Sequence, residues 1–115
     1  MIMRKETIDN AMRDLSAGAK VVYGDKLREV ILFGSCARGD FDEESDVDVM
    51  ILLDVSKLEA VSERDKIRTV IHGLDRKYDY ELLFSPIVQS YSEFNYWSDA
   101  LPFYRNIKKE GVRYA

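Results

Sequence analysis

The apolar run from Val49 to Leu53 is the feature that most constrains how this chain of 115 residues can fold. As a short continuous apolar run, it predicts a buried β-strand over residues 47–53. The run is far too short to span a bilayer. Asp46 and Asp48 stand at the head of this strand and would point to the same face, with Cα atoms roughly 7 Å apart. Two like charges held there are unfavourable unless a cation lies between them, so the pair predicts a metal site.

Hydrophobic periodicity, turn residues and capping patterns predict the other elements. Before the strand over 47–53, these are a helix over about residues 4–23, a strand over 28–33 that ends at Gly34, and a turn or short helix over 35–38. After it come a helix from the capping box of Ser56 and Glu59 to about Lys77, a strand over 78–84 closed by Ser85 and Pro86, a short aromatic segment capped at Ser90, and a final helix from Pro102 to Gly111.

This order of elements indicates the fold class. A strand, a helix and a further strand in succession imply a sheet with helices packed against it, so we expect the α/β or α+β class. At this length we expect one domain over residues 1–115.

Composition narrows the class of protein. The formal net charge is −4, which gives no general attraction to nucleic acid or to an anionic membrane. Cys36 is the only cysteine, so an internal disulfide is excluded and a reducing compartment is expected. No apolar segment follows Arg4 and Lys5, so we expect no signal peptide and a soluble protein of the cytoplasm.

Gly34 and Ser35 are a second candidate element of a site. Glycine lets the backbone approach a phosphate without a Cβ, the Ser35 hydroxyl can donate, and backbone N–H groups of a turn can form an anion-binding nest. Taken alone, these residues could be an ordinary turn, and Asp46 and Asp48 a solvated strand entrance. Their combination favours a site for a metal and a nucleotide.

Two short motifs stand at a specific spacing in the sequence. They are Leu-Phe-Gly-Ser-Cys-Ala-Arg-Gly at residues 32–39 and Ser-Asp-Val-Asp at residues 45–48, and ten residues separate Ser35 from Asp46. With this spacing, the region from about residue 28 to 84 resembles the nucleotidyltransferase superfamily of the DNA polymerase β type, and in particular the minimal nucleotidyltransferases. The resemblance implies a palm-type fold, with a small mixed β-sheet flanked by helices. It also implies transfer of a nucleoside monophosphate, expected to be AMP from ATP, to a hydroxyl group with release of pyrophosphate.

The resemblance assigns roles to the matching residues. Gly34 and Ser35 would bind the phosphates, while Asp46 and Asp48 would hold one or two Mg²⁺ ions. Arg38 would either contact a phosphate or pair with the acidic loop that follows it, and the sequence leaves both roles open.

A third carboxylate, acting as metal ligand and as base toward the incoming hydroxyl, is also implied by the resemblance. Asp79 and Glu81 are the candidates, because they share one parity on the strand predicted over 78–84. Glu81 is favoured because it directly precedes an apolar run, whereas Asp79 could simply begin the strand. Glutamate in this place departs from the more usual aspartate, so the identity of the base stays open.

Several further residues are expected to serve structure rather than chemistry. Cys36 is expected to be a small packing residue, rather than a nucleophile paired with His72, the only histidine. We expect a solvated loop to contain Asp40, Asp42, Glu43 and Glu44. We expect the core or a partner interface to contain the aromatic group Tyr91, Phe94, Tyr96 and Trp97. We expect a solvated helix face to contain the basic group Arg105, Lys108, Lys109 and Arg113. The alternatives are a base stacked on the aromatic group and a nucleotide or acceptor bound by the basic group.

The region of resemblance and its flanking helices use the whole chain, so no second domain is expected to hold the acceptor. We therefore expect a partner protein or a homodimer. Minimal nucleotidyltransferases often pair with helical HEPN-type proteins as antitoxins, and the resemblance permits transfer of AMP to such a toxin. The alternative is a catalytically weak or inactive module of this fold that binds a partner. Transfer to a small molecule such as an aminoglycoside is disfavoured by the lack of an acceptor domain.

Overall fold

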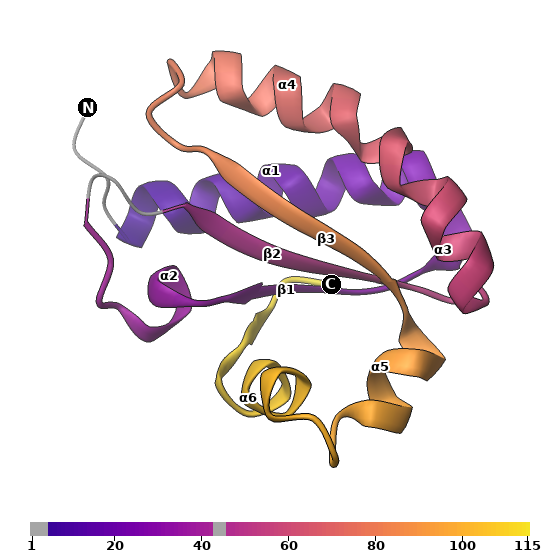
Figure 1. Ribbon diagram of the computed structural model, residues 1–115. Coiled ribbons are helices and arrows are strands. Elements are labelled where there is room, and N and C mark those ends of the chain that lie inside the picture. The colour runs from indigo at the N-terminus through magenta and orange to yellow at the C-terminus, as the bar shows by residue number, and fades with distance from the viewer. Residues whose placement is uncertain (1–4, 43–45) are drawn as a thin grey trace.

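A computed structural model describes residues 5–42 and 46–115 of the chain. Within these ranges it contains a four-stranded sheet in the order β3-β2-β1-β4. The strands are β1 (Leu27–Phe33), β2 (Val47–Leu53), β3 (Phe84–Ser90) and β4 (Val112–Arg113). β1 runs antiparallel to β2 and to β4, whereas β3 runs parallel to β2, so the sheet is mixed. The predicted fold class, a small mixed sheet flanked by helices, is confirmed (Figure 1).

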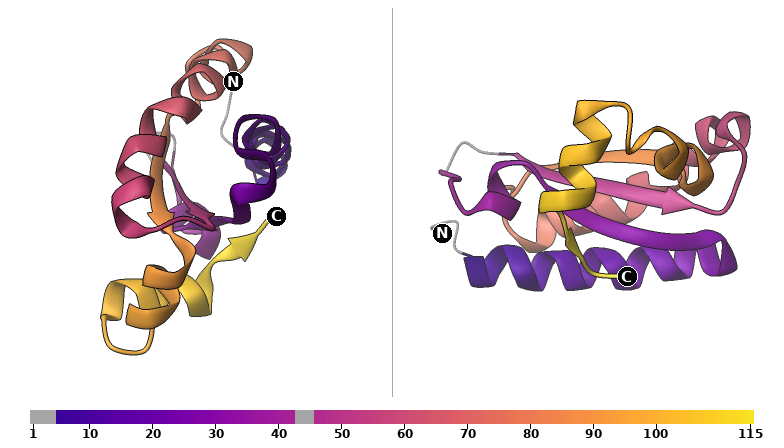
Figure 2. Two further views of the ribbon diagram at one scale, coloured as in Figure 1. Left: turned by 90° about the vertical axis from the view of Figure 1, so that its right-hand side faces the viewer. Right: turned by 90° about the horizontal axis from the view of Figure 1, so that it is seen from below.

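Helices cover both faces of the sheet (Figures 1 and 2). Two helices, α1 and α4, pack on one face, and two others, α5 and α6, pack on the opposite face. The helical elements are α1 (Lys5–Tyr23), α2 (Ser35–Arg38), α3 (Lys57–Glu63), α4 (Arg68–Lys77), α5 (Tyr91–Trp97) and α6 (Pro102–Glu110), with 3₁₀ turns η1 (Gly24–Lys26) and η2 (Arg64–Ile67). In the part of the chain that the structure describes, none of these helices has the length and apolar character that crossing a membrane requires.

β2 is buried on both of its faces. Val49 and Ile51 belong to the core beneath α1 and α4, whereas Met50 and Leu52 belong to the core beneath α5 and α6. Every residue from Val49 to Leu53 is 0% exposed. A strand covered on both sides needs apolar side chains in both directions, which explains why this run is continuous rather than alternating.

Both predicted helix caps are confirmed. The Ser56 hydroxyl oxygen accepts a hydrogen bond from the Glu59 backbone N–H at 3.1 Å. The Ser90 hydroxyl oxygen accepts one from the Glu93 backbone N–H at 3.3 Å. These bonds satisfy donors that have no partner within the helix, so the starts of α3 and α5 are set by local sequence.

The helix predicted to run to Lys77 is divided into α3 and α4 by the 3₁₀ turn η2. The Tyr23 hydroxyl, from the end of α1, donates to the Glu63 carbonyl at 2.8 Å. The Glu63 carboxylate is buried and forms ion pairs with Lys26 at 3.1 Å and Lys66 at 2.9 Å. Contacts from Tyr23 and Lys26, far away in the sequence, therefore coincide with the division between α3 and α4. The local hydrophobic periodicity gives no sign of these contacts.

The strand predicted over residues 78–84 is wrong, because β3 begins only at the last of these residues. Tyr78 caps the end of α4, and its hydroxyl donates to the Asp14 carboxylate of α1 at 2.9 Å. Asp79 and Tyr80 have φ angles of 55° and 59°, in the left-handed region that often ends a helix. The segment therefore turns the chain out of α4 before the strand starts.

Pro86 lies within β3 instead of closing a strand. In the described sheet β3 is an edge strand, where a residue without an N–H group is tolerated. The sequence also gave no indication of β4, since two residues are too few to show a periodic pattern.

Candidate functional site

The Asp48 carboxylate lies directly over the Cα atom of Gly34. In the antiparallel pairing of β1 with β2, Asp48 is opposite Phe33, the residue before this glycine. Gly34 has φ 75° and ψ −156°, and a Cβ atom there would collide with Asp48 Oδ2. Only glycine permits both this backbone conformation and this approach. The predicted phosphate-binding turn and the predicted metal-binding carboxylate are therefore in contact.

Asp46 and Asp48 lie together at the start of β2, the first exposed and the second partly buried. Burial raises the pKa of the Asp48 carboxyl, the negative charge of Asp46 raises it further, and the positive charge of Arg38 opposes the rise. The ionised form is thus disfavoured in the absence of a cation. Two carboxylates side by side form an oxygen donor set that suits Mg²⁺.

The segment after Gly34 forms a single helical turn, α2. The Gly34 carbonyl accepts hydrogen bonds from the N–H groups of Ala37 and Arg38, each at 3.1 Å. Gly39 then ends the turn with φ 84°, and its N–H donates to the Ser35 carbonyl at 2.9 Å. The Ser35 N–H, at the start of this turn, has no acceptor within the helix, as expected for a first residue.

Cys36 is a buried packing residue, as predicted. Its thiol donates to the Asp46 carbonyl at 3.6 Å. Burial, together with the charge of Asp48, raises the pKa of the thiol to about 11. The thiol therefore stays protonated at neutral pH and is a poor nucleophile.

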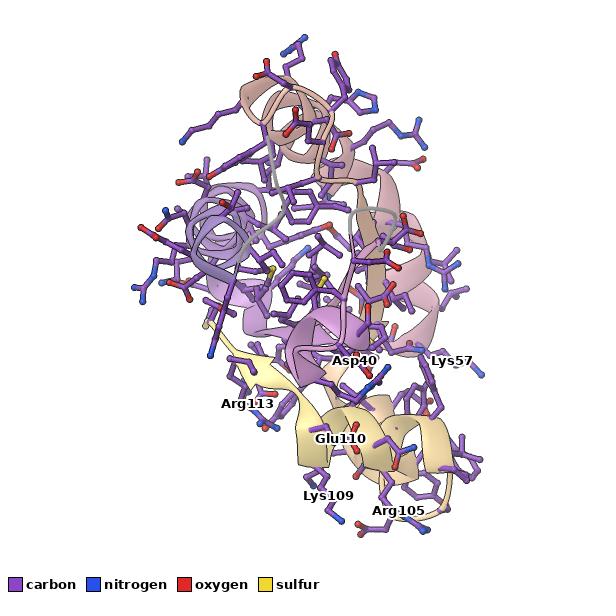
Figure 3. The ribbon with its side chains drawn as sticks, turned by 90° about the vertical axis from the view of Figure 1, so that its left-hand side faces the viewer. Asp40, Lys57, Arg105, Lys109, Glu110 and Arg113 are labelled. Atoms are coloured by element: carbon purple, nitrogen blue, oxygen red, sulfur yellow. The ribbon has the colours of Figure 1, made fainter. Side chains whose placement is uncertain are left out.

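A cavity of about 290 Å³ opens beside Gly34 and Asp48. Phe33 and Arg38 line it from the side of β1 and α2, and helix α6 closes the other side; the residues of α6 are Phe103, Asn106, Ile107 and Glu110. Figure 3 views this end of the molecule, where α2 lies next to α6, the helix on which Glu110 is labelled. The cavity thus joins the predicted site to a helix that the sequence did not connect with it.

Arg38 makes one of the two contacts that the sequence left open, the pairing with the acidic loop, whereas contact with a phosphate stays a prediction. Its guanidinium forms an exposed ion pair with Asp40 at 3.4 Å, so it contacts the acidic loop. It also lines the cavity and acts on the pKa of Asp48. Asp40 and Asp42 are exposed, as expected for a solvated loop, whereas Glu43 and Glu44 lie outside the described residues.

The strand expected to carry the third carboxylate begins after both candidate residues. Asp79 and Glu81 precede β3, so they do not share a face of one strand. Over residues 5–42 and 46–115, no three Asp, Glu, His or Cys side chains form a group that could hold a metal ion. Within these ranges, neither Asp79 nor Glu81 therefore completes such a group with Asp46 and Asp48.

Ser85 occupies the position beside Asp48 on the neighbouring strand. In the parallel pairing of β2 with β3, these two residues are direct partners, so their side chains point to the same face. Ser85 is exposed. The residue that β3 places beside Asp48 therefore carries a hydroxyl rather than an acid.

The aromatic group predicted near residue 94 divides between core and surface, and none of its members lines the cavity. Phe94 is 1% exposed and packs 5.3 Å from the Tyr104 ring. Tyr91 lies under the Arg28 guanidinium at 4.5 Å, while Tyr96 and Trp97 are exposed.

The basic group predicted as a solvated helix face stays at the surface. Arg105 donates to the Asp99 carbonyl at 2.6 Å, and Arg113 pairs with Glu29 at 3.4 Å. Neither of these contacts involves the cavity.

Sequence reasoning missed the contribution of α6 to the site. Phe103, Asn106 and Glu110 are separated by three and four residues, which places them on one face of the predicted final helix. That spacing was the available signal. It could not show that this face meets Gly34, because the direction of the helix is set by packing on the sheet.

The sequence of this chain is similar to those of known proteins. A family model described as "Nucleotidyltransferase domain" matches residues 13–114. "Putative protein adenylyltransferase MJ0141" from Methanocaldococcus jannaschii is 47% identical over 83 residues, which cover 72% of this chain and 76% of that protein. "Putative protein adenylyltransferase MJ0604" from the same organism is 34% identical over 106 residues, which cover 90% of this chain and 93% of that protein.

We expect Gly34→Ala to lower the free energy of unfolding by about 1–3 kcal/mol, because it strains the backbone and displaces the Asp48 carboxylate. Gly24→Ala is the matched control, since Gly24 has φ +55° but a Cβ there would have no neighbour within 4 Å. Denaturant unfolding of both variants measures the difference. A loss at Gly34 no larger than that at Gly24 would show that the contact with Asp48 has no effect on stability.

Proposed function

This chain belongs to the nucleotidyltransferase domain family, and we propose that it transfers AMP from ATP to a hydroxyl group of a partner protein in a reaction that requires Mg²⁺. The family and the relatives show a nucleotidyltransferase of the minimal type, an enzyme that uses a nucleoside triphosphate. The choice of AMP and of a protein acceptor is supported by the two relatives, which are both named as protein adenylyltransferases.

The contact between Gly34 and Asp48 is the observation that best supports this function. It joins the end of β1, where a phosphate would bind, to the start of β2, where a cation would bind. A nucleoside triphosphate with a bound Mg²⁺ needs both kinds of group within a few ångströms. The pairing of β1 with β2 holds them together without help from a flexible loop.

The residues present fit a divalent cation and a triphosphate. Asp46 and Asp48 would hold Mg²⁺, which would neutralise charge on the phosphates. Gly34 and Ser35 would bind phosphate oxygens through backbone N–H groups and the Ser35 hydroxyl, and Arg38 would add a positive charge. The acceptor hydroxyl oxygen forms a bond to the α-phosphorus, the bond from that phosphorus to the pyrophosphate oxygen breaks, and the hydroxyl proton passes to a base.

Glu81 is the acid that we propose as third ligand and base, in preference to Asp79. The Val47 N–H donates to the Leu83 carbonyl at 2.9 Å, so the chain before β3 runs beside the start of β2. Glu81, two residues earlier and partly buried, therefore lies toward the end of the sheet that carries Asp46. Asp79 is exposed at the end of α4 and has the less favourable place.

MgATP is expected to raise the melting temperature, and Asp46→Asn with Asp48→Asn is expected to abolish the rise. At a ligand concentration about 100 times Kd, binding stabilises the folded state by about 2.7 kcal/mol, which thermal denaturation detects easily. Asp48→Asn alone should melt no lower than the wild type without ligand, because it removes a carboxylate whose pKa is raised by burial. An intact protein that shows no Mg²⁺-dependent response to ATP would overturn the proposed function.

We expect Glu81→Gln to weaken Mn²⁺ binding severalfold and Ser85→Asp, added to that variant, to restore it. The restored carboxylate would stand beside Asp48 on β3. Mn²⁺ titration followed by electron paramagnetic resonance gives the affinity, with Ser85→Asn as the uncharged control. Wild-type affinity in Glu81→Gln would exclude Glu81 as a ligand.

The acceptor is proposed to be a helical HEPN-type partner protein, with this chain as its antitoxin in the cytoplasm. A homodimer is the alternative way to complete the acceptor site. The residue set around Asp48 supports catalysis. The position of Glu81 before β3, with Ser85 rather than an acid paired to Asp48, favours a second candidate, a weak or inactive module that only binds its partner.

Labelled ATP separates these two functions. We expect transfer of label from α-³²P-ATP to a helical protein encoded beside this chain, with one pyrophosphate released for each AMP attached. Asp46→Asn with Asp48→Asn serves as the control without transfer. Formation of a stable complex with neither label nor pyrophosphate would support the binding module instead.

A further inference from the structure

Helix α6 is fixed to the sheet by its inner face. Ile107 is 3% exposed and belongs to the core shared with β1 and β2. Tyr104 accepts a hydrogen bond from Gln89 of β3 at 3.0 Å. Gly111, just after the helix, lies so close to β1 that a Cβ there would collide with the Ile31 side chain. The outer side chains of α6 therefore have a defined place relative to Gly34 and Asp48.

The face of α6 toward the site carries an aromatic ring and an amide. Phe103 and Asn106 are one helical turn apart, and both line the cavity that also contains Gly34 and Asp48. The Phe103 ring is 52% exposed, although it packs edge-to-face against Phe33 with ring centroids 5.8 Å apart. Asn106 is exposed and makes no side-chain hydrogen bond among the residues described. Both side chains are thus available to a ligand.

The size of the cavity suits one part of a nucleotide. Its volume of about 290 Å³ is just below the range of whole small-molecule sites, which is about 300 to 1,000 Å³. The polar groups that would bind phosphates, at Gly34 and Asp48, lie along one side of it. The remaining walls include the rings of Phe33 and Phe103, which suit a flat, weakly polar group such as a nucleobase, next to the side chains of Arg38, Asn106, Ile107 and Glu110.

We propose that Phe103 and Asn106 form the nucleoside subsite of this enzyme, with the ring stacked on an adenine base and the amide hydrogen-bonded to its edge. This inference rests on the proposed function, because the phosphates must bind at Gly34 for the base to enter the cavity. Stacking on an aromatic ring binds any base, whereas a side-chain amide presents a donor and an acceptor that match the edge of adenine. The ring would therefore supply affinity and the amide selectivity.

Calorimetric titration with two ligands tests the subsite. MgATP carries the base, and magnesium tripolyphosphate carries only the phosphates. We expect Phe103→Leu and Asn106→Ala each to weaken MgATP binding by about tenfold, while tripolyphosphate affinity stays within about twofold of wild type. Phe103→Trp should retain MgATP binding, and Asn106→Ala should also reduce the preference for ATP over GTP.

The control is Tyr96→Leu, which removes an aromatic ring that is 74% exposed and does not line the cavity. It should bind both ligands as the wild type does. Unchanged MgATP affinity in Phe103→Leu and Asn106→Ala, or an equal loss of both ligands, would overturn the subsite and leave the proposed function standing. A wild-type protein that binds neither ligand would overturn both.

Discussion

The burial of β2 on both faces is the constraint on which the rest of the structure depends. A strand in the middle of a sheet, covered by helices on each side, must be apolar in both directions, and its pairing with β1 and β3 fixes both neighbours. Polar residues can appear only where this cover ends. Asp46 and Asp48 stand at that point, so the position of the candidate site follows from the position of the core.

The parts of the fold that could be predicted are those with local causes. The run of β2, the stripe of α1 and the serine caps of α3 and α5 are each visible within a few residues of sequence, and the structure agrees with them. The candidate turn at Gly34 belongs to the same group, since glycine is needed there for the backbone and for Asp48 alike. The close approach of Asp48 to Gly34 depends on the register of β1 and β2. From the sequence, this register could be inferred only by assuming that both residues belong to one site.

The errors have non-local causes. Residues 78–84 have the composition of a strand, but Tyr78 is bound to Asp14 of α1 and the next two residues leave the helix in a left-handed conformation. Strand parity made Asp79 and Glu81 the two candidates for the third carboxylate, and that argument is wrong because both residues precede β3. Which of the two is the third carboxylate stays a prediction. The contribution of α6 was missed for the opposite reason, because its pattern was correct but its orientation depends on contacts with β1 and β3.

The outer strands of the sheet restrict how this protein can associate with others. β3 contains Pro86, which has no N–H to donate, and β4 is only two residues long. Unpaired sheet edges act as templates for strand addition and aggregation, and both prolines and very short strands suppress this. A protein substrate would therefore be recognised through side chains of the helices and loops around the site, rather than by extending the sheet. Such recognition can distinguish one acceptor from another, because backbone pairing alone carries little sequence information.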